Sequence, residues 1–307
     1  MATTQEVNRT AEASPLPRLL SLDAVAWDGA YSAEQTASAL QILEAGGIIT
    51  LPRLGFALTP AERELLPAQD LQLRAKSASY DAATGRIKGG RLTAEHAGVL
   101  RDMMNRYARA SRQLLHHLFP RYAPWLEGGR TSYRPVEAQG RAGSWRKDDR
   151  RLHVDAFPSR PVQDRRLLRV FTNINPDGRP RVWRTGEAFE EVARRYLPQI
   201  RRPLPGTHAL LHLAGITRSR RSEYDHLMLQ LHDRMKADLA YQEAVSGSTL
   251  RFAAQSTWVV QTDAVSHAVT TGQYLLEQTF LLPVTAMADP QRSPLRVLER
   301  QLGRRLA

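Results

Sequence analysis

The pattern of hydrophobic and polar positions divides the N-terminal part of the chain into a polar leader, a helix and a strand. Residues 1–17 are rich in Thr, Ala, Glu and Pro, which is typical of a disordered leader. Ser32, with Gln35 three positions later, predicts a capped helix start, and the glycines at 46–47 end that helix. The apolar run at 48–51 then predicts a strand.

Helical periodicity returns after this strand and dominates up to residue 119. A second helix is predicted to begin at Thr59, with proline in the first helical position. Residues 76–91 contain three glycines and favour a loop. Leu and Met then recur every three or four positions over 93–119, which predicts the longest helix of the chain.

From residue 130 the pattern becomes that of strands, interrupted once by helices. Strand-like segments lie at about 130–185 and 248–285, and a mostly helical insertion over about 187–245 separates them. In the first group, a period of two places Arg169 and Asn173 on the same face of a strand. The pattern predicts an α+β protein with N-terminal helices, and the order of its elements resembles that of a double-stranded β-helix (jelly-roll-like) core. It would form a single domain over 18–290, followed by an amphipathic C-terminal helix over 291–307.

Composition narrows the classes of function. The 307 residues contain no cysteine, which excludes disulfides, zinc–thiolate sites and iron–sulfur clusters and fits a reducing cytoplasm. The formal net charge of +12 indicates an anionic partner: nucleic acid, a membrane surface or a phosphorylated substrate. No RNA-binding, zinc-finger or helix-turn-helix pattern accompanies the charge, so we expect no nucleic-acid partner.

A His-x-Asp pair is the first candidate for metal chemistry. His153 and Asp155 would project from the same face of a strand, while Val154 packs on the other. A third ligand is available at His267, in the second strand-rich region. Two histidines and one carboxylate form the facial triad of non-haem Fe(II), which leaves coordination positions open. A His-x-Asp motif by itself more often forms only a hydrogen bond between its two side chains. The metal hypothesis therefore depends on the strand-like segments around the motif.

The order of elements around this triad resembles that of the Fe(II)/2-oxoglutarate dioxygenases. A dicarboxylate cosubstrate needs a fixed cation, and a bidentate arginine suits it best. In most enzymes of this kind the cation follows the distal histidine by about one strand, but residues 268–280 contain no Arg or Lys. Arg169 is therefore the preferred anchor and Arg134 the second candidate.

A closer resemblance extends over residues 130–280. Besides the segment RLHVDAFPSRP at 151–161, the matching segments are 132–135, 144–149, 168–176, 180–184, 265–268, 272–274 and 277–279. In these segments the chain resembles the Kdo 3-hydroxylase family of lipopolysaccharide-modifying dioxygenases.

This resemblance implies a reaction and a set of site residues. The enzyme would use Fe(II), 2-oxoglutarate and O₂ to hydroxylate C3 of the outer 3-deoxy-D-manno-octulosonic acid (Kdo) of Kdo₂-lipid A, which converts Kdo to Ko. Arg169 and Arg134 would hold anionic groups. The further pocket candidates are Trp183, Asn173, Arg146, Lys147 and Arg160. A related dioxygenase acting on another anionic lipid or sugar remains an alternative, as does a catalytically inactive jelly-roll module that binds glycolipid.

The lipid-anchored substrate implies a place in the cell. We expect a cytoplasmic protein, peripheral on the inner membrane of a Gram-negative bacterium. Ser293 predicts the start of the C-terminal helix, whose leucines form one narrow stripe beside a row of arginines. That helix would lie on the anionic membrane, or dock its stripe on its own domain or on a neighbouring subunit of a homo-oligomer.

Overall fold

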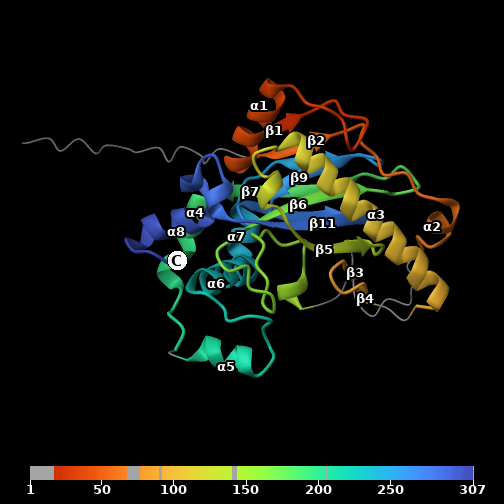
Figure 1. Ribbon diagram of the computed structural model, residues 1–307. Coiled ribbons are helices and arrows are strands. Elements are labelled where there is room, and N and C mark those ends of the chain that lie inside the picture. The colour runs from red at the N-terminus through yellow and green to blue at the C-terminus, as the bar shows by residue number, and fades with distance from the viewer. Residues whose placement is uncertain (1–16, 68–76, 90–91, 140–143, 205, 307) are drawn as a thin grey trace, which may run out of the picture.

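A large curved sheet forms the frame of the molecule (Figure 1). The computed structural model describes residues 17–67, 77–89, 92–139, 144–204 and 206–306, so nearly all of the expected leader lies outside the described residues. The sheet has eight strands in the order β1-β2-β9-β6-β11-β5-β3-β4. In chain order, these strands are β1 (Leu19–Ser21), β2 (Ile48–Leu51), β3 (Ala78–Asp81), β4 (Arg86–Lys88), β5 (Glu127–Arg134), β6 (Arg166–Asn173), β9 (Thr257–Gln261) and β11 (Leu275–Leu282). Neighbouring strands are antiparallel except β1 and β2.

A smaller sheet packs against one face of the large sheet. It contains β10 (Val265–Thr271), β7 (Arg181–Ala188) and β8 (Thr249–Phe252). Aromatic side chains from both sheets fill the space between them: Phe252 stacks on Trp258 at 4.0 Å between ring centroids, and Trp183 meets Phe171 edge to face at 5.2 Å. This apolar layer closes one end of the sandwich, where the predicted metal ligands lie.

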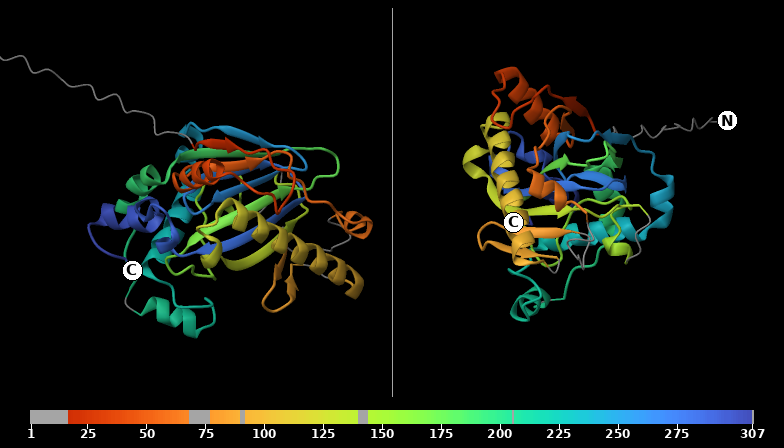
Figure 2. Two further views of the ribbon diagram at one scale, coloured as in Figure 1. Left: turned by 45° about the horizontal axis from the view of Figure 1, so that its top comes forward. Right: turned by 90° about the vertical axis from the view of Figure 1, so that its right-hand side faces the viewer.

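Three N-terminal helices, α1 (Ala33–Glu44), α2 (Pro60–Glu64) and α3 (Ala94–Leu118), cover the other face of the large sheet (Figures 1 and 2). The capping box predicted at Ser32 is present, and Thr59 makes a second one. The long helix α3 buries its Leu and Met positions, as predicted. The prediction of a loop over 76–91 was wrong, because β3 and β4 form a hairpin there that extends the sheet beside β5.

The helical insertion comprises α4 (Phe189–Tyr196), α5 (Thr207–Leu213), α6 (Glu223–Ala237) and α7 (Leu239–Ala244). Helices α4, α6 and α7 bury apolar side chains in one core cluster with the metal-ligand segment. Helix α5 instead stands away from the body of the protein (Figures 1 and 2). The insertion therefore has a packed part next to the site and a protruding part.

The C-terminal helix α8 (Pro294–Leu302) begins at the predicted cap, Ser293, and ends at Gly303, which has φ 65°. Its apolar stripe is covered by the protein itself, because Leu295 and Leu298 are buried in the cluster with α4. Of the three alternatives for this helix, namely the membrane, its own domain and a neighbouring subunit, the structure supports docking on its own domain. In the described part of the chain, helices long and apolar enough to cross a bilayer are not found.

Candidate metal centre

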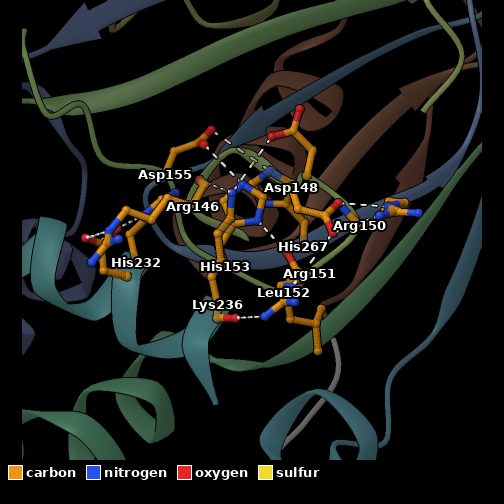
Figure 3. Close-up of polar contacts among 12 residues, drawn as sticks. Arg146, Asp148, Arg150, Arg151, Leu152, His153, Asp155, His232, Lys236 and His267 are labelled. Carbon is orange, nitrogen blue, oxygen red and sulfur yellow. Dashed lines mark hydrogen bonds and ion pairs between the residues drawn. The ribbon is translucent and has the colours of Figure 1, made fainter. Parts of the chain in front are cut away.

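The backbone brings the predicted ligands together directly. His153 and His267 form an isolated antiparallel bridge, in which each donates its N–H to the other's carbonyl, at 3.1 and 2.9 Å. Two residues after His153, the N–H of Asp155 donates to Thr262 O at 2.8 Å. The two segments thus run side by side, and the three side chains emerge on the same side (Figure 3).

The ligand atoms of His153, Asp155 and His267 lie within 4.8 Å of one another. Nε2 of His153 is 3.6 Å from Oδ1 of Asp155, and Nε2 of His267 is 3.9 Å from Oδ2. The Nδ1 atoms point away, to Arg151 O at 2.7 Å and Val265 O at 2.8 Å. A carbonyl can only accept, so each Nδ1 carries the proton and each Nε2 lone pair faces the centre, as metal-binding histidines require.

The environment also fixes the charge of these ligands. Burial lowers the pKa of His153 to about 3 and lowers the pKa of His267, so both rings are neutral. Burial alone would raise the pKa of Asp155, but Arg169 and the histidines hold it well below its usual value. Two neutral imidazoles and one carboxylate suit a divalent metal ion. Oδ2 of Asp155 is buried and accepts no hydrogen bond from the described residues, although Arg169 Nη1 lies 3.0 Å away at ion-pair distance.

Arg169 and Arg134 line the cavity next to this centre, but both are partly engaged. Arg134 donates to Glu277 at 2.8 Å and to Asp149 at 3.2 Å. Arg169 lies between Asp155 and Glu277, with Nη1 3.3 Å from Glu277 Oε1, while its Nε has no hydrogen-bond partner among the described residues. Glu277, on β11, therefore holds both candidate anchors in place.

A third arginine of the cavity, Arg181 on β7, is buried but was missed in the sequence. Its Nη1 donates to Gly272 O at 3.1 Å, and its buried Nε finds no partner in the described part of the chain. Burial and repulsion from Arg134 lower its pKa to about 10. A period of two places Arg181 on the same strand face as Trp183, and that spacing could have identified it.

The cavity is small and rich in unsatisfied donors. It measures about 40 Å³ and is lined by the three ligands and by Arg134, Asp149, Arg169, Phe171, Arg181, Trp183, Val269, Leu275 and Glu277. Trp183 stacks on the His267 ring at 4.9 Å, and its buried Nε1 also lacks a partner among the residues described. The lining contains three arginines and three carboxylates, whose charges cancel. A divalent metal ion bound together with a dianion adds no net charge, so the cavity would stay neutral. Buried donors without acceptors fit an anionic cosubstrate beside the metal.

Comparison with known proteins identifies the family of this chain. The family model for 3-deoxy-D-manno-oct-2-ulosonic acid (Kdo) hydroxylase matches residues 26–305. The chain belongs to the Kdo hydroxylase family. Crystal structures of the Kdo hydroxylase KdoO, a non-haem Fe(II) α-ketoglutarate-dependent dioxygenase, superpose on it closely. The complex with α-ketoglutarate and Fe(III) has a TM-score of 0.90 at 45% identity, and the cobalt(II) complex has 0.91 at 46%.

Each of these two comparisons covers 97% of the KdoO chain and 94% of this chain. A search of curated proteins found no match. This Kdo hydroxylase is thus an Fe(II)/2-oxoglutarate-dependent dioxygenase with the expected jelly-roll core.

Helix α6 adds a second layer behind the metal centre of this Kdo hydroxylase. The His232 ring meets the His153 ring edge to face at 5.3 Å. Lys236 is buried, donates to Arg146 O at 3.2 Å and lies 3.8 Å from Asp149. Burial lowers the pKa of Lys236, and the nearby carboxylates oppose this shift. Figure 3 shows both side chains beside the triad. Neither was singled out in the sequence, where they are ordinary positions on a predicted helix.

The other predicted pocket residues lie outside the cavity lining. Asn173 uses its amide on Arg179 O and Phe252 O, so it fixes the end of β6. Arg146 is exposed and paired with Asp233 at 3.1 Å, and Lys147 is exposed. Arg160 lies 3.9 Å from Asp81, in a different cluster. The prediction for Arg146, Lys147 and Arg160 relied on their proximity to the ligands in sequence, but the chain turns outward on both sides of His153 and Asp155.

Proposed function

We propose that this Kdo hydroxylase hydroxylates C3 of the outer Kdo sugar of Kdo₂-lipid A, with His153, Asp155 and His267 as its iron ligands. The observation that carries this proposal is the meeting of these three side chains in a buried cavity that also contains three arginines. Bound iron, 2-oxoglutarate and O₂ supply the oxidising chemistry, in which one oxygen atom enters the sugar and the other appears in succinate as CO₂ is released.

The residues of the chain would orient and neutralise the participants. The carbonyl partners of both Nδ1 atoms hold the imidazoles with Nε2 facing the metal. Trp183 covers one face of His267 and excludes water from that side. Val154 and Leu152 anchor the ligand segment in the core below it. Such support keeps the open coordination positions directed at the cavity.

Arg169 and Arg181 would bind the carboxylate of 2-oxoglutarate that is remote from the metal. Each has a buried Nε–H without a hydrogen-bond partner among the described residues, whereas the Nε–H of Arg134 already donates to Glu277. Arg134 would then act by holding Glu277, which in turn positions Arg169. A guanidinium pair also matches the planar geometry of a carboxylate.

The test is reconstitution with Fe(II) and 2-oxoglutarate, followed by measurement of succinate and of oxygen incorporation into Kdo₂-lipid A. Alanine at His153, Asp155 or His267 should abolish both products and iron binding. His117→Ala, a change at an exposed histidine at the end of α3, should leave them unchanged. Succinate formation that is coupled only to another anionic sugar would reject the proposed substrate, and iron binding by all three variants would reject the ligand assignment.

We also propose that the enzyme works at the cytoplasmic face of the inner membrane, because its substrate carries a lipid anchor. The net charge of +12 supports attraction to an anionic leaflet. Fractionation of cells that express the protein, with and without a high-salt wash, tests this proposal. Full recovery in the soluble fraction at low salt would contradict it.

A further inference from the structure

The protruding segment around α5 exposes an unusual amount of apolar surface. Leu204, Leu210, Leu213 and Ile216 are 79%, 67%, 81% and 58% exposed. These four make up half of the large hydrophobic side chains that are exposed in the described part of the protein. Among its α-helices, α5 alone contains no buried residue. Apolar side chains gathered on a protrusion mark an interaction site rather than a core.

The sequence around this apolar tip carries only positive charge. Residues 200–222 contain five arginines, at positions 201, 202, 218, 220 and 221, and no Asp or Glu. A leucine-rich tip with basic flanks is typical of segments that lie in the interface of an anionic bilayer. A site for a second protein copy would instead need acidic groups to complement these arginines.

Three arginines gather at the base of the protrusion around a single carboxylate. Arg218 and Arg160 lie 3.7 and 3.9 Å from Asp81, and Arg130 on β5 completes the group. Burial and repulsion from the other two arginines lower the pKa of Arg160 to about 10. Buried nitrogens of Arg160 and Arg130 lack hydrogen-bond partners in the described residues. One carboxylate does not balance three cations, so an added phosphate would relieve the repulsion.

The protrusion is also joined to the segment that carries the metal ligands. Arg218 N–H donates to Ser159 O at 3.1 Å, and Arg221 Nη2 donates to Pro158 O at 2.7 Å. Pro158 lies three residues after Asp155. A membrane bound at the protrusion would therefore lie next to the loop that leaves the metal centre.

We propose that Leu204 and residues 206–221 dock this enzyme on an anionic lipid bilayer, with the apolar tip entering the edge of the acyl layer and Arg130, Arg160 and Arg218 binding lipid phosphates. This inference rests on the proposed membrane-associated function and names the surface that serves it. It also replaces α8, whose stripe is buried, as the membrane-binding element.

Site-specific fluorescence gives the sharpest test, because the natural chain has no cysteine. Leu213→Cys, labelled with a polarity-sensitive dye, should shift its emission to the blue on phosphatidylglycerol vesicles but not on phosphatidylcholine vesicles. Val25→Cys is the matched control, since Val25 is 69% exposed on a distant part of the fold and should show no shift. An unshifted Leu213 probe, or equal shifts at both positions, would overturn the proposal.

Vesicle flotation measures how strongly the protein binds to the bilayer. Leu210→Ser/Leu213→Ser should weaken binding to phosphatidylglycerol vesicles at least about tenfold, because a buried leucine contributes at least ~1.4 kcal/mol. Val25→Ser/Leu239→Ser, which removes two exposed apolar side chains elsewhere, should bind as the unmodified chain does. Equal vesicle binding by both double variants would refute the assignment. So would loss of a dimer in the first variant, measured by sedimentation, without a change in vesicle binding.

Activity separates this inference from the proposed function. The Leu210/Leu213 double variant should lose turnover of vesicle-embedded Kdo₂-lipid A but retain turnover of the delipidated Kdo oligosaccharide. If the unmodified protein turns over neither substrate while its Leu213 probe still enters vesicles, the proposed substrate fails and the docking surface stands. If both substrates are turned over and the probe stays in water, the docking surface fails alone.

Discussion

Replacing Arg181 tests the arrangement of the cosubstrate site most directly. Its guanidinium is buried, donates to one backbone carbonyl and keeps an Nε–H without a partner among the described residues. A charge-assisted hydrogen bond to a carboxylate contributes about 1.5–3 kcal/mol. Arg181→Gln should therefore raise the KM for 2-oxoglutarate about 10- to 150-fold. The KM of Arg181→Lys should lie between those of the unmodified enzyme and of Arg181→Gln, because lysine keeps the charge but lacks the planar guanidinium.

The same change has an opposite expected effect on stability. Burial and Arg134 lower the pKa of Arg181, so its charged form is unfavourable in the folded protein without cosubstrate. Removing that charge should leave the melting temperature of the metal-free protein equal or higher, while 2-oxoglutarate should no longer raise it. This combination is typical of a binding residue kept at the expense of stability.

The assays are steady-state kinetics in 2-oxoglutarate and the visible absorption of the anaerobic Fe(II)–2-oxoglutarate complex, titrated with cosubstrate. Arg251→Gln is the matched control, since Arg251 is exposed on β8 and pairs in register with Val182, the neighbour of Arg181. An unchanged KM in Arg181→Gln would refute the reasoning. A marked fall in melting temperature with unchanged binding would show instead that Arg181 serves the fold.

Three further predictions concern stability. Glu277→Gln removes the buried carboxylate between Arg134 and Arg169 and should cost about 3–5 kcal/mol in urea unfolding, whereas a cost below 1 kcal/mol would show that the pair is dispensable. Burial lowers the pKa of His153 from 6.5 to about 3, so the unfolded chain binds the proton more tightly than the folded protein does. The free energy of unfolding of the metal-free protein should therefore fall by about 2 kcal/mol between pH 7 and pH 5. His153→Gln should reduce this dependence on pH. Leu298→Ala, at a fully buried position of α8, should cost about 2–5 kcal/mol, while Arg300→Ala on the exposed side should change stability by less than ~0.5 kcal/mol. If the two changes in α8 had equal effects, its docking on the domain would be wrong.

The sequence predicted those features that depend on local patterns. The Ser32 capping box, the long helix α3 and the strand that carries Arg169 are encoded in short stretches and appear as expected. The β3–β4 hairpin was missed because its strands are only four and three residues long, which is too short for a clear alternation. It is stabilised by pairing with β5, which is distant in sequence.

In the site as well, the sequence predicted what depends on local spacing and missed what depends on contacts between distant segments. His153 and Asp155 follow from their spacing, and the structure places His267 beside them. Arg181 was overlooked among 43 basic residues, because its spacing of two from Trp183 places both on one strand face but does not show that this face is buried. Only the three-dimensional arrangement separates it from Arg146, which is nearer to the ligands in sequence and yet faces solvent. The burial of the α8 stripe likewise depends on α4, which no property of the tail itself reveals.

The hydrogen-bonded bridge between His153 and His267 has a consequence for biosynthesis. During translation, the first histidine and Asp155 emerge long before β10, and they have no partner strand until that strand is made. The proposed iron site is therefore completed only after β10 has left the ribosome. Because such distant pairing is slow to form, metal loading should follow folding rather than guide it. Ribosome-bound chains that stop before β10 should accordingly fail to retain iron.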